Sequence, residues 1–420
     1  MTMQQLISIL LIAMLVAGCG RDDAGPTGGT EAGLDDLARE YLFLELAMGQ
    51  HDPAHVDAYF GPESIREEAE AADATLGDIR NRAAGLVGRI EAHRPGADAE
   101  TLQRIDGLLG RLRALDTRAL MASGETLSFD EESRRLFGAV APDHDAAHFE
   151  AILAEIDALL GGDGDLSARV NAFRDRFVIP PDRLAEVFDA AIAECRRRTL
   201  DNMTLPDGES FTLEYVTDKP WSGYNWYQGH SQSLIQINTD LPIYISRAVD
   251  LGCHEGYPGH HTFNALLEQY LVRERGWLEF TLYPLFSPQS LIAEGSGNYG
   301  IDLAFPDDQR IEFEKTVLFP LAGLDAGEAD RYYALLELLA RLDYAGNEAA
   351  RDYLNGTIDR AAAEEWLVDY ALSSPERAAQ RVDFFDTYRS YVINYNLGKD
   401  LVRDYVERGD ADAAERWRRF

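Results

Sequence analysis

The chain has 420 residues, of which 46% are hydrophobic and 27% charged, so it can form a large core and is not disordered as a whole. Its 39 basic and 73 acidic residues give a formal net charge of −34, and a field of that sign repels phosphate groups. We therefore expect no nucleic-acid partner and no electrostatic docking on an anionic membrane surface.

Residues 1–19 have the features of an export signal. The apolar run from Leu6 to Ala17 has the length of a secretory signal peptide and is too short for a comfortable membrane span. It ends in Leu15-Val16-Ala17-Gly18-Cys19, which resembles the lipobox of a bacterial lipoprotein, whose cysteine becomes the lipidated first residue after cleavage. We therefore expect lipidation of Cys19 and a lipoprotein of the cell envelope, facing the periplasm or the exterior. An ordinary cleaved signal peptide, the alternative, would also export the protein.

Residues 20–33 are rich in Gly, with Pro and acidic residues, and predict a flexible tether. From Leu34 onward, apolar residues recur at helical spacing, which predicts that residues 34–203 form a helical scaffold lobe. Export would place Cys195 and Cys253 in a compartment where they can pair, although their spacing does not test this.

Residues 204–420 are expected to form the catalytic lobe. Residues 211–216 and 233–238 alternate between apolar and polar side chains, and residues 219–223 between them have a turn composition. These patterns predict a short antiparallel sheet. The helical period returns after Pro242 and runs into the most informative stretch of the chain.

Three of the nine histidines, His254, His260 and His261, lie within eight residues. Neutral imidazoles beside a carboxylate, here Glu255, suit a zinc ion with its own general base. In a His-Glu-x-x-His motif the second ligand is four residues after the first, where this chain has Pro258. Because proline removes a backbone N–H and clashes with the carbonyl four residues earlier, the helix must kink or bulge there. Spacing alone leaves the second ligand open.

The stretch His254-Glu255-Gly256-Tyr257-Pro258-Gly259-His260 resembles the His-Glu-x-x-Pro-Gly-His signature of the bacterial family catalogued as domain of unknown function 885, regarded as a relative of the gluzincin metallopeptidases. The resemblance implies a mainly α, large helical zincin-like fold with a small antiparallel β-sheet beside the metal-binding helix. It implies zinc ligands at His254 and His260, with His261 as the alternative to His260.

The family also has a downstream Glu-Gly-x-x-x-Tyr, and this chain has Glu294-Gly295-Ser296-Gly297-Asn298-Tyr299. Glu294 is thus the implied third ligand. Asn298 stands where many gluzincins have an acid that orients a ligand histidine, and its amide oxygen can accept the same hydrogen bond.

A third stretch, Tyr388 to Lys399, resembles the family's C-terminal Tyr-x-x-Gly-Lys helix. A zinc hydrolase needs a hydrogen-bond donor for the developing oxyanion, and Tyr395 is the first candidate and Tyr391 the second. Packing of these aromatic rings in the core is the alternative. Arg389 or Lys399 is a candidate for binding a substrate carboxylate.

These features together predict a zinc-dependent metallopeptidase acting on short peptides. Glu255 would take a proton from the attacking water and pass it to the leaving amine. Two alternatives remain: a metal-dependent amidase acting on non-peptide or cell-wall amides, and a non-catalytic zinc-binding surface lipoprotein, in which Glu255 would be superfluous. The same ligands would accept other divalent metals. Membrane contact is expected only through the lipid at Cys19.

Overall fold

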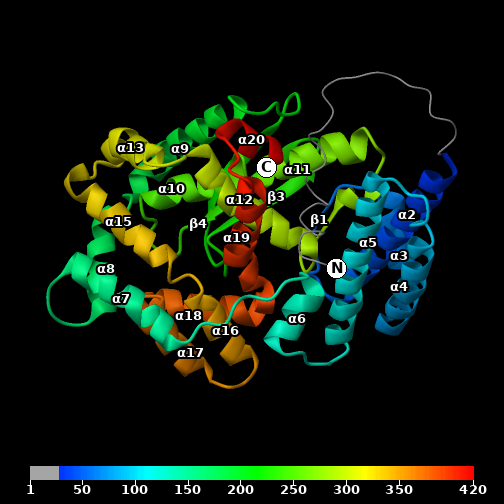
Figure 1. Cartoon of the computed structure of the whole chain (residues 1–420), viewed down its shortest axis with the longest axis horizontal. Coiled ribbons are helices and arrows are strands. Elements are labelled where there is room, and N and C mark those ends of the chain that lie inside the picture. The colour runs from blue at the N-terminus through cyan, green and yellow to red at the C-terminus, as the bar shows by residue number, and fades with distance from the viewer. Residues whose placement is uncertain (1–27) are drawn as a thin grey trace.

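The computed structural model describes residues 28–420 and is mainly helical, as the sequence predicts, with two small sheets (Figure 1). The first helical elements are α2 (Gly28–His51), α3 (Glu63–Ala72), α4 (Leu76–Glu91), α5 (Ala99–Ala122), α6 (Phe129–Leu136), α7 (Ala146–Leu160), α8 (Leu166–Arg174), η2 (Asp175–Phe177), η3 (Pro181–Arg183) and α9 (Leu184–Leu200). Next come α10 (Ser246–Leu251), η4 (Gly252–Gly256), α11 (His260–Leu267), η5 (Glu268–Arg273), η6 (Leu278–Thr281), α12 (Pro288–Ala304), α13 (Gln309–Phe313), η7 (Glu314–Leu318), α14 (Phe319–Ala322) and η8 (Ala326–Glu328). The last are α15 (Ala329–Ala340), α16 (Ala345–Leu354), α17 (Arg360–Tyr370), α18 (Pro375–Tyr388), η9 (Arg389–Val392), α19 (Ile393–Glu407) and α20 (Ala413–Arg419).

The predicted signal peptide, Cys19 and most of the predicted tether lie outside the described residues. The end of that tether differs from expectation, because α2 begins at Gly28. Within the described part of the chain, no helix combines the length and the apolar character needed to cross a membrane.

The strands are β1 (Val56–Tyr59), β2 (Ser210–Val216), β3 (Gly223–Gly229), β4 (Gln232–Asn238) and β5 (Leu282–Pro284). The larger sheet has the order β2-β4-β3, in which β3 and β4 are antiparallel but β2 and β4 are parallel. The prediction of an antiparallel sheet is therefore wrong for the β2-β4 pair. The physical reason is β3, which the sequence reading missed: one reversal leads from β2 to β3 and a second, through His230 and Ser231, leads back to β4. Those two residues have φ of 55° and 56°, as a tight hairpin turn requires.

The smaller sheet pairs β1 with β5, so the half of the chain read as purely helical also contributes a strand. Helices α2, α3, α4 and α5 gather on one side of the molecule in Figure 1, around a core that includes Tyr41 and Ile79. A second core joins Phe149 and Phe188 to Val249 and Tyr332, on both sides of residue 203. The division into lobes at that residue stays a prediction.

Helices α12 and α19 cross closely in the middle of the molecule (Figure 1). At the crossing, a Cβ on Gly295 would lie 2.3 Å from the carbonyl oxygen of Gly398, and a Cβ on Gly398 would lie 2.6 Å from that of Leu291. Only glycine fits at these two positions. Gly295 and Gly398 therefore allow the backbones of α12 and α19 to approach closely.

Cys195 of α9 and Cys253 of η4 form a disulfide, with their Cα atoms 5.5 Å apart. The pairing that the spacing left open is thus present. It links the segment that includes His254 to a helix of the N-terminal half.

An ion pair between Arg104 of α5 and Glu279 of η6 attaches the N-terminal helices to the rest of the chain, and its contribution to stability can be tested. The guanidinium of Arg104 donates to both oxygens of Glu279, at 2.6 and 2.9 Å, and the two side chains are 2% and 1% exposed. Because Arg104→Met leaves a buried carboxylate unpaired, we expect it to lower the free energy of unfolding by about 3–5 kcal/mol. Urea unfolding followed by circular dichroism measures the loss. The matched control is Arg39→Met, which removes an ion pair to Glu68 whose side chains are 43% and 50% exposed, and should cost at most about 1 kcal/mol. Equal losses in the two variants would contradict the attachment.

Candidate metal and catalytic site

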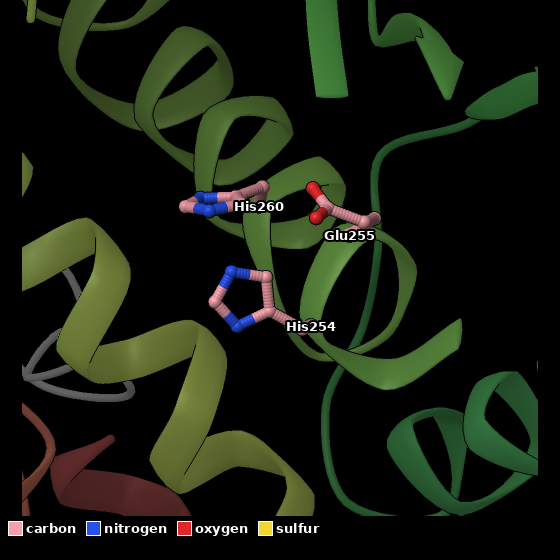
Figure 2. A group of neighbouring side chains, drawn as sticks. All are labelled: His254, Glu255 and His260. Carbon is pink, nitrogen blue, oxygen red and sulfur yellow. The ribbon is translucent and has the colours of Figure 1, made fainter. Parts of the chain in front are cut away.

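The helix that begins as α10 is interrupted at the motif, as Pro258 predicts. It widens into the π-helical turn η4, Tyr257 is extended, and α11 starts at His260. The N–H of Gly259 donates to the carbonyl of Cys253 at 2.9 Å. This break brings His260 back beside His254, and the two rings lie at 90° with centroids 4.7 Å apart (Figure 2).

Glu294, from α12, contacts both imidazoles. Its Oε2 atom lies 3.2 Å from Nε2 of His254 and 3.6 Å from Nε2 of His260, and has no hydrogen-bond partner among the described residues. In a tetrahedral zinc site with ligand distances of about 2.0–2.2 Å, neighbouring ligand atoms are about 3.3–3.6 Å apart. The donor types, and the two distances from Glu294, therefore fit a zinc ion.

Glu294 and His260 shift each other's pKa values. Burial disfavours charge on Glu294, but the positive charge of His260 and the proximity of His254 hold its pKa well below the usual range. Burial likewise disfavours charge on His260, yet the proximity of Glu294 raises the pKa of His260 to about 9. Because a metal takes the neutral imidazole, binding must displace a proton, and zinc affinity is expected to fall as the pH decreases.

Glu255 is the second carboxylate at this site, and Figure 2 shows it beside the two histidines. One of its oxygens and one nitrogen of each histidine lie within 4.8 Å of one another. The carboxylate is buried, which raises its pKa, while His254 and His260 oppose the rise. Asn225 of β3 donates to the backbone carbonyl of Glu255 at 2.7 Å, so the sheet lies beside the segment that contains His254 and Glu255, as predicted.

Asn298 and Tyr391 support the proposed ligands. Nδ1 of His254 and Oδ1 of Asn298 are 3.0 Å apart, and the Asn298 amide donates to the backbone carbonyl of Tyr395 at 2.8 Å. The hydroxyl of Tyr391 donates to Oε1 of Glu294 at 2.7 Å. Tyr395 lines the cavity in front of the site, with its ring 5.9 Å from that of Tyr391.

His261 belongs to a separate buried network. Its Nδ1 lies 2.8 Å from the hydroxyl of Ser233 and its Nε2 lies 3.0 Å from Oε2 of Glu209. Tyr257 donates to the same Glu209 oxygen at 2.5 Å. Both ring nitrogens of His261 thus have partners away from Glu294.

The two cations predicted to bind a substrate carboxylate have other partners. Arg389 donates to the buried Glu132 at 2.7 Å and does not line the cavity, so its position contradicts the predicted role. Sequence reading could not detect the pair, because the two residues are 257 positions apart. Lys399 does line the cavity, but its Nζ is 2.8 Å from a carboxylate oxygen of Asp302.

The site forms part of the wall of a cavity of about 960 Å³. A residue that sequence reading missed, Asp57 of β1, also lines it and accepts a hydrogen bond from Tyr224 at 3.0 Å. Burial is the largest influence on Asp57 and raises its pKa to about 6, and His260 partly opposes the rise. No local motif marks Asp57, since it reaches the site only through the pairing of β1 with β5.

Gly297 offers a test of the candidate metal site in which none of the proposed ligands is substituted. A Cβ at this position would lie 2.8 Å from Nδ1 and 2.9 Å from Cε1 of His254, so Gly297→Ala must displace the imidazole. We expect zinc to bind about 10–100-fold more weakly, as when the partner that orients a ligand is lost. Zinc titration against a competing chelator measures the change. Gly85→Ala on α4, where no atom lies within 4 Å of the new methyl group, is the control, and unchanged affinity in Gly297→Ala would contradict the assignment.

No family model matches the chain, and no curated protein matches it. Two solved structures are similar to it. A predicted lipoprotein from Colwellia psychrerythraea is 15% identical, with a TM-score of 0.47, and the match covers 81% of this chain and 66%, just under two thirds, of that one. The M32 carboxypeptidase from Deinococcus radiodurans R1 is 14% identical, with a TM-score of 0.36, over 92% of this chain and 89% of that one. With TM-scores below 0.5, neither similarity assigns a role to a residue of this chain.

Proposed function

We propose that the protein is a zinc-dependent metallopeptidase that hydrolyses short peptides. The observation that carries the proposal is a Glu294 oxygen with no hydrogen-bond partner among the described residues, facing two histidine nitrogens, with a second carboxylate, Glu255, beside them. A structural zinc site needs no extra buried carboxylate next to its ligands. The cavity supports access for a small substrate.

In this proposal His254, His260 and Glu294 hold zinc, which when bound supplies a Lewis acid that polarises the peptide carbonyl and acidifies water. Glu255 accepts a proton from the attacking water and delivers it to the leaving nitrogen. The C–O bond forms first, which places negative charge on the former carbonyl oxygen, and the C–N bond breaks once the nitrogen is protonated, giving a carboxylate and an amine. Tyr395 donates to the developing oxyanion, because the hydroxyl of Tyr391 is already bonded to Glu294.

We also propose that the protein acts in the cell envelope, anchored by a lipid at Cys19. The apolar run before that cysteine and the lipobox-like sequence support this location. The disulfide between Cys195 and Cys253 is consistent with an oxidising compartment.

Glu255→Gln tests the catalytic mechanism. The substitution preserves the size of the side chain but removes the proton acceptor, so we expect kcat for a mixed short-peptide library to fall by about 10²–10⁴-fold while zinc content stays stoichiometric. Mass spectrometry of the library and metal analysis provide the two measurements. Hydrolysis at the wild-type rate would refute the mechanism. If wild-type protein with stoichiometric zinc leaves the library untouched, the peptidase proposal itself is wrong.

The ligand assignment is tested by substituting the two neighbouring histidines separately. We expect His260→Ala to lose stoichiometric zinc, because it removes one of the three donors, and His261→Asn to retain it, because that ring bonds to Ser233 and Glu209 instead. Zinc content is measured on protein whose circular dichroism matches the wild type. Full zinc retention in His260→Ala would exclude it as a ligand.

A further inference from the structure

The cavity that contains the proposed zinc site is lined by an unusual number of cations for so acidic a chain, and most of them have acidic partners. Arg247 and Arg310 pair with Asp250, Arg341 with Glu155, Lys399 with Asp302, and Arg403 with Asp400. Among the side chains that the structure describes, three cavity arginines have no carboxylate within ion-pair distance: Arg174, Arg377 and Arg381.

Position distinguishes these three arginines. Arg174 and Arg377 both lie against the ring of Tyr244, 4.4 and 5.1 Å from its centroid, and Arg377 also donates to the backbone carbonyl of Pro242. The guanidinium carbon of Arg381 instead lies 6.0 Å from the ring centroid of Tyr395, the residue proposed to contact the oxyanion.

Arg381 lies among aromatic rings and, in the part of the chain that the structure describes, has no carboxylate partner, an environment in which a guanidinium can bind an anion. Its guanidinium carbon lies 5.0 and 5.5 Å from the ring centroids of Phe384 and Phe385. The N–H groups of this guanidinium donate no hydrogen bond to any residue within 33–420. Burial lowers its pKa, and the influence of Tyr395 and of Asp343, which lies beyond ion-pair distance, does not compensate. Arg381 is partly buried and has no ion partner among those residues, and its planar guanidinium matches a carboxylate in shape and charge.

A short chain of contacts connects Arg381 to the zinc site. Its guanidinium is 6.0 Å from the ring of Tyr395, that ring is 5.9 Å from the ring of Tyr391, and Tyr391 donates to Glu294. An extended peptide advances about 3.3–3.6 Å per residue, so the two ring spacings together are about three to four residues long. A carboxylate on Arg381 therefore belongs to a residue close to the cleaved bond.

We propose that Arg381 binds the C-terminal carboxylate of the substrate, so that the enzyme cleaves a few residues at most from the free carboxyl end of short peptides. This inference rests on the proposed peptidase function and deepens it by naming the substrate class. Arg381 takes the role that sequence reading gave to Arg389 or Lys399, both of which have carboxylate partners within the protein. Proteins without an accessible C-terminus, and peptides with an amidated one, are excluded as good substrates.

The test compares two probes on zinc-loaded full-length protein: a pool of N-acetylated tripeptides with free C-termini, and the same pool with C-terminal amides. Binding is measured by calorimetry in the Glu255→Gln background, so that the peptides are not consumed. We expect amidation to weaken binding about 10–100-fold, as for loss of a charge-assisted hydrogen bond. Arg381→Gln should weaken binding of the free acids by the same factor and leave binding of the amides within about 2-fold.

Two further variants test whether the preference for free acids depends on the guanidinium group and on position 381. Arg381→Lys keeps the charge but not the planar fork, so it should recover part of the preference for free acids. Arg403→Gln removes a cavity arginine that already has a partner, Asp400, and should leave the preference unchanged.

The outcomes separate this inference from the proposed function. If free acids and amides bind equally well, or if Arg381→Gln weakens both equally, the carboxylate site is wrong. If wild type hydrolyses acids and amides at equal rates, the peptidase proposal stands and this inference falls. If the preference for free acids depends on Arg381 but wild type hydrolyses neither pool, the carboxylate site stands and the peptidase proposal falls.

Discussion

The break in the helix between His254 and His260 is the constraint on which the candidate site depends. A continuous helix would separate two residues six positions apart on different faces, about 9 Å along the axis. The widened turn η4 and the extended Tyr257 instead return the chain so that the two rings meet. Proline prevents the helix from closing, and a Cβ at Gly259 would lie 1.8 Å from the carbonyl oxygen of His254. The Pro-Gly pair is therefore part of the metal site, although neither residue provides a donor atom.

The third donor depends on a different constraint, the close crossing of α12 and α19. Gly295 and Gly398 allow the two backbones to touch, which places Tyr391 and the backbone of Tyr395 against α12. Glu294 is held by Tyr391, and His254 by Asn298, so both proposed ligands are oriented from this crossing. Since well-oriented ligands bind metal more tightly, the crossing provides the rigidity that the broken helix lacks.

Sequence predicted what local chemistry determines. The helical class and the break at Pro258 follow from residue types at short spacing, whereas the partner role of Asn298 is implied by the family resemblance. Sequence reading failed where distant segments meet. It missed β3 and the parallel β2-β4 pair, because strand direction depends on the number of reversals between strands. It missed Asp57, which β1 brings to the cavity, and assigned Arg389 to substrate although Glu132 neutralises it. The sequence pattern of a helix does not predict which distant charged side chain will form an ion pair with one of its residues.

The charge of the chain explains why unpaired cations are informative here. With 73 acidic and 39 basic residues, a random arginine is far more often near a carboxylate than away from one, and a net charge of −34 repels an anionic peptide from most of the surface. An arginine without a carboxylate partner inside the cavity therefore gives a locally positive potential in a chain whose net charge is negative. In the proposed role, Arg381 would attract the carboxyl end of an approaching peptide toward Tyr395. The amine at the other end of the peptide is favoured by the acidic groups that line the same cavity, Asp57 among them. In the proposed arrangement, opposite charges at the two ends of a peptide would match opposite charges in the cavity, and this match would favour short substrates.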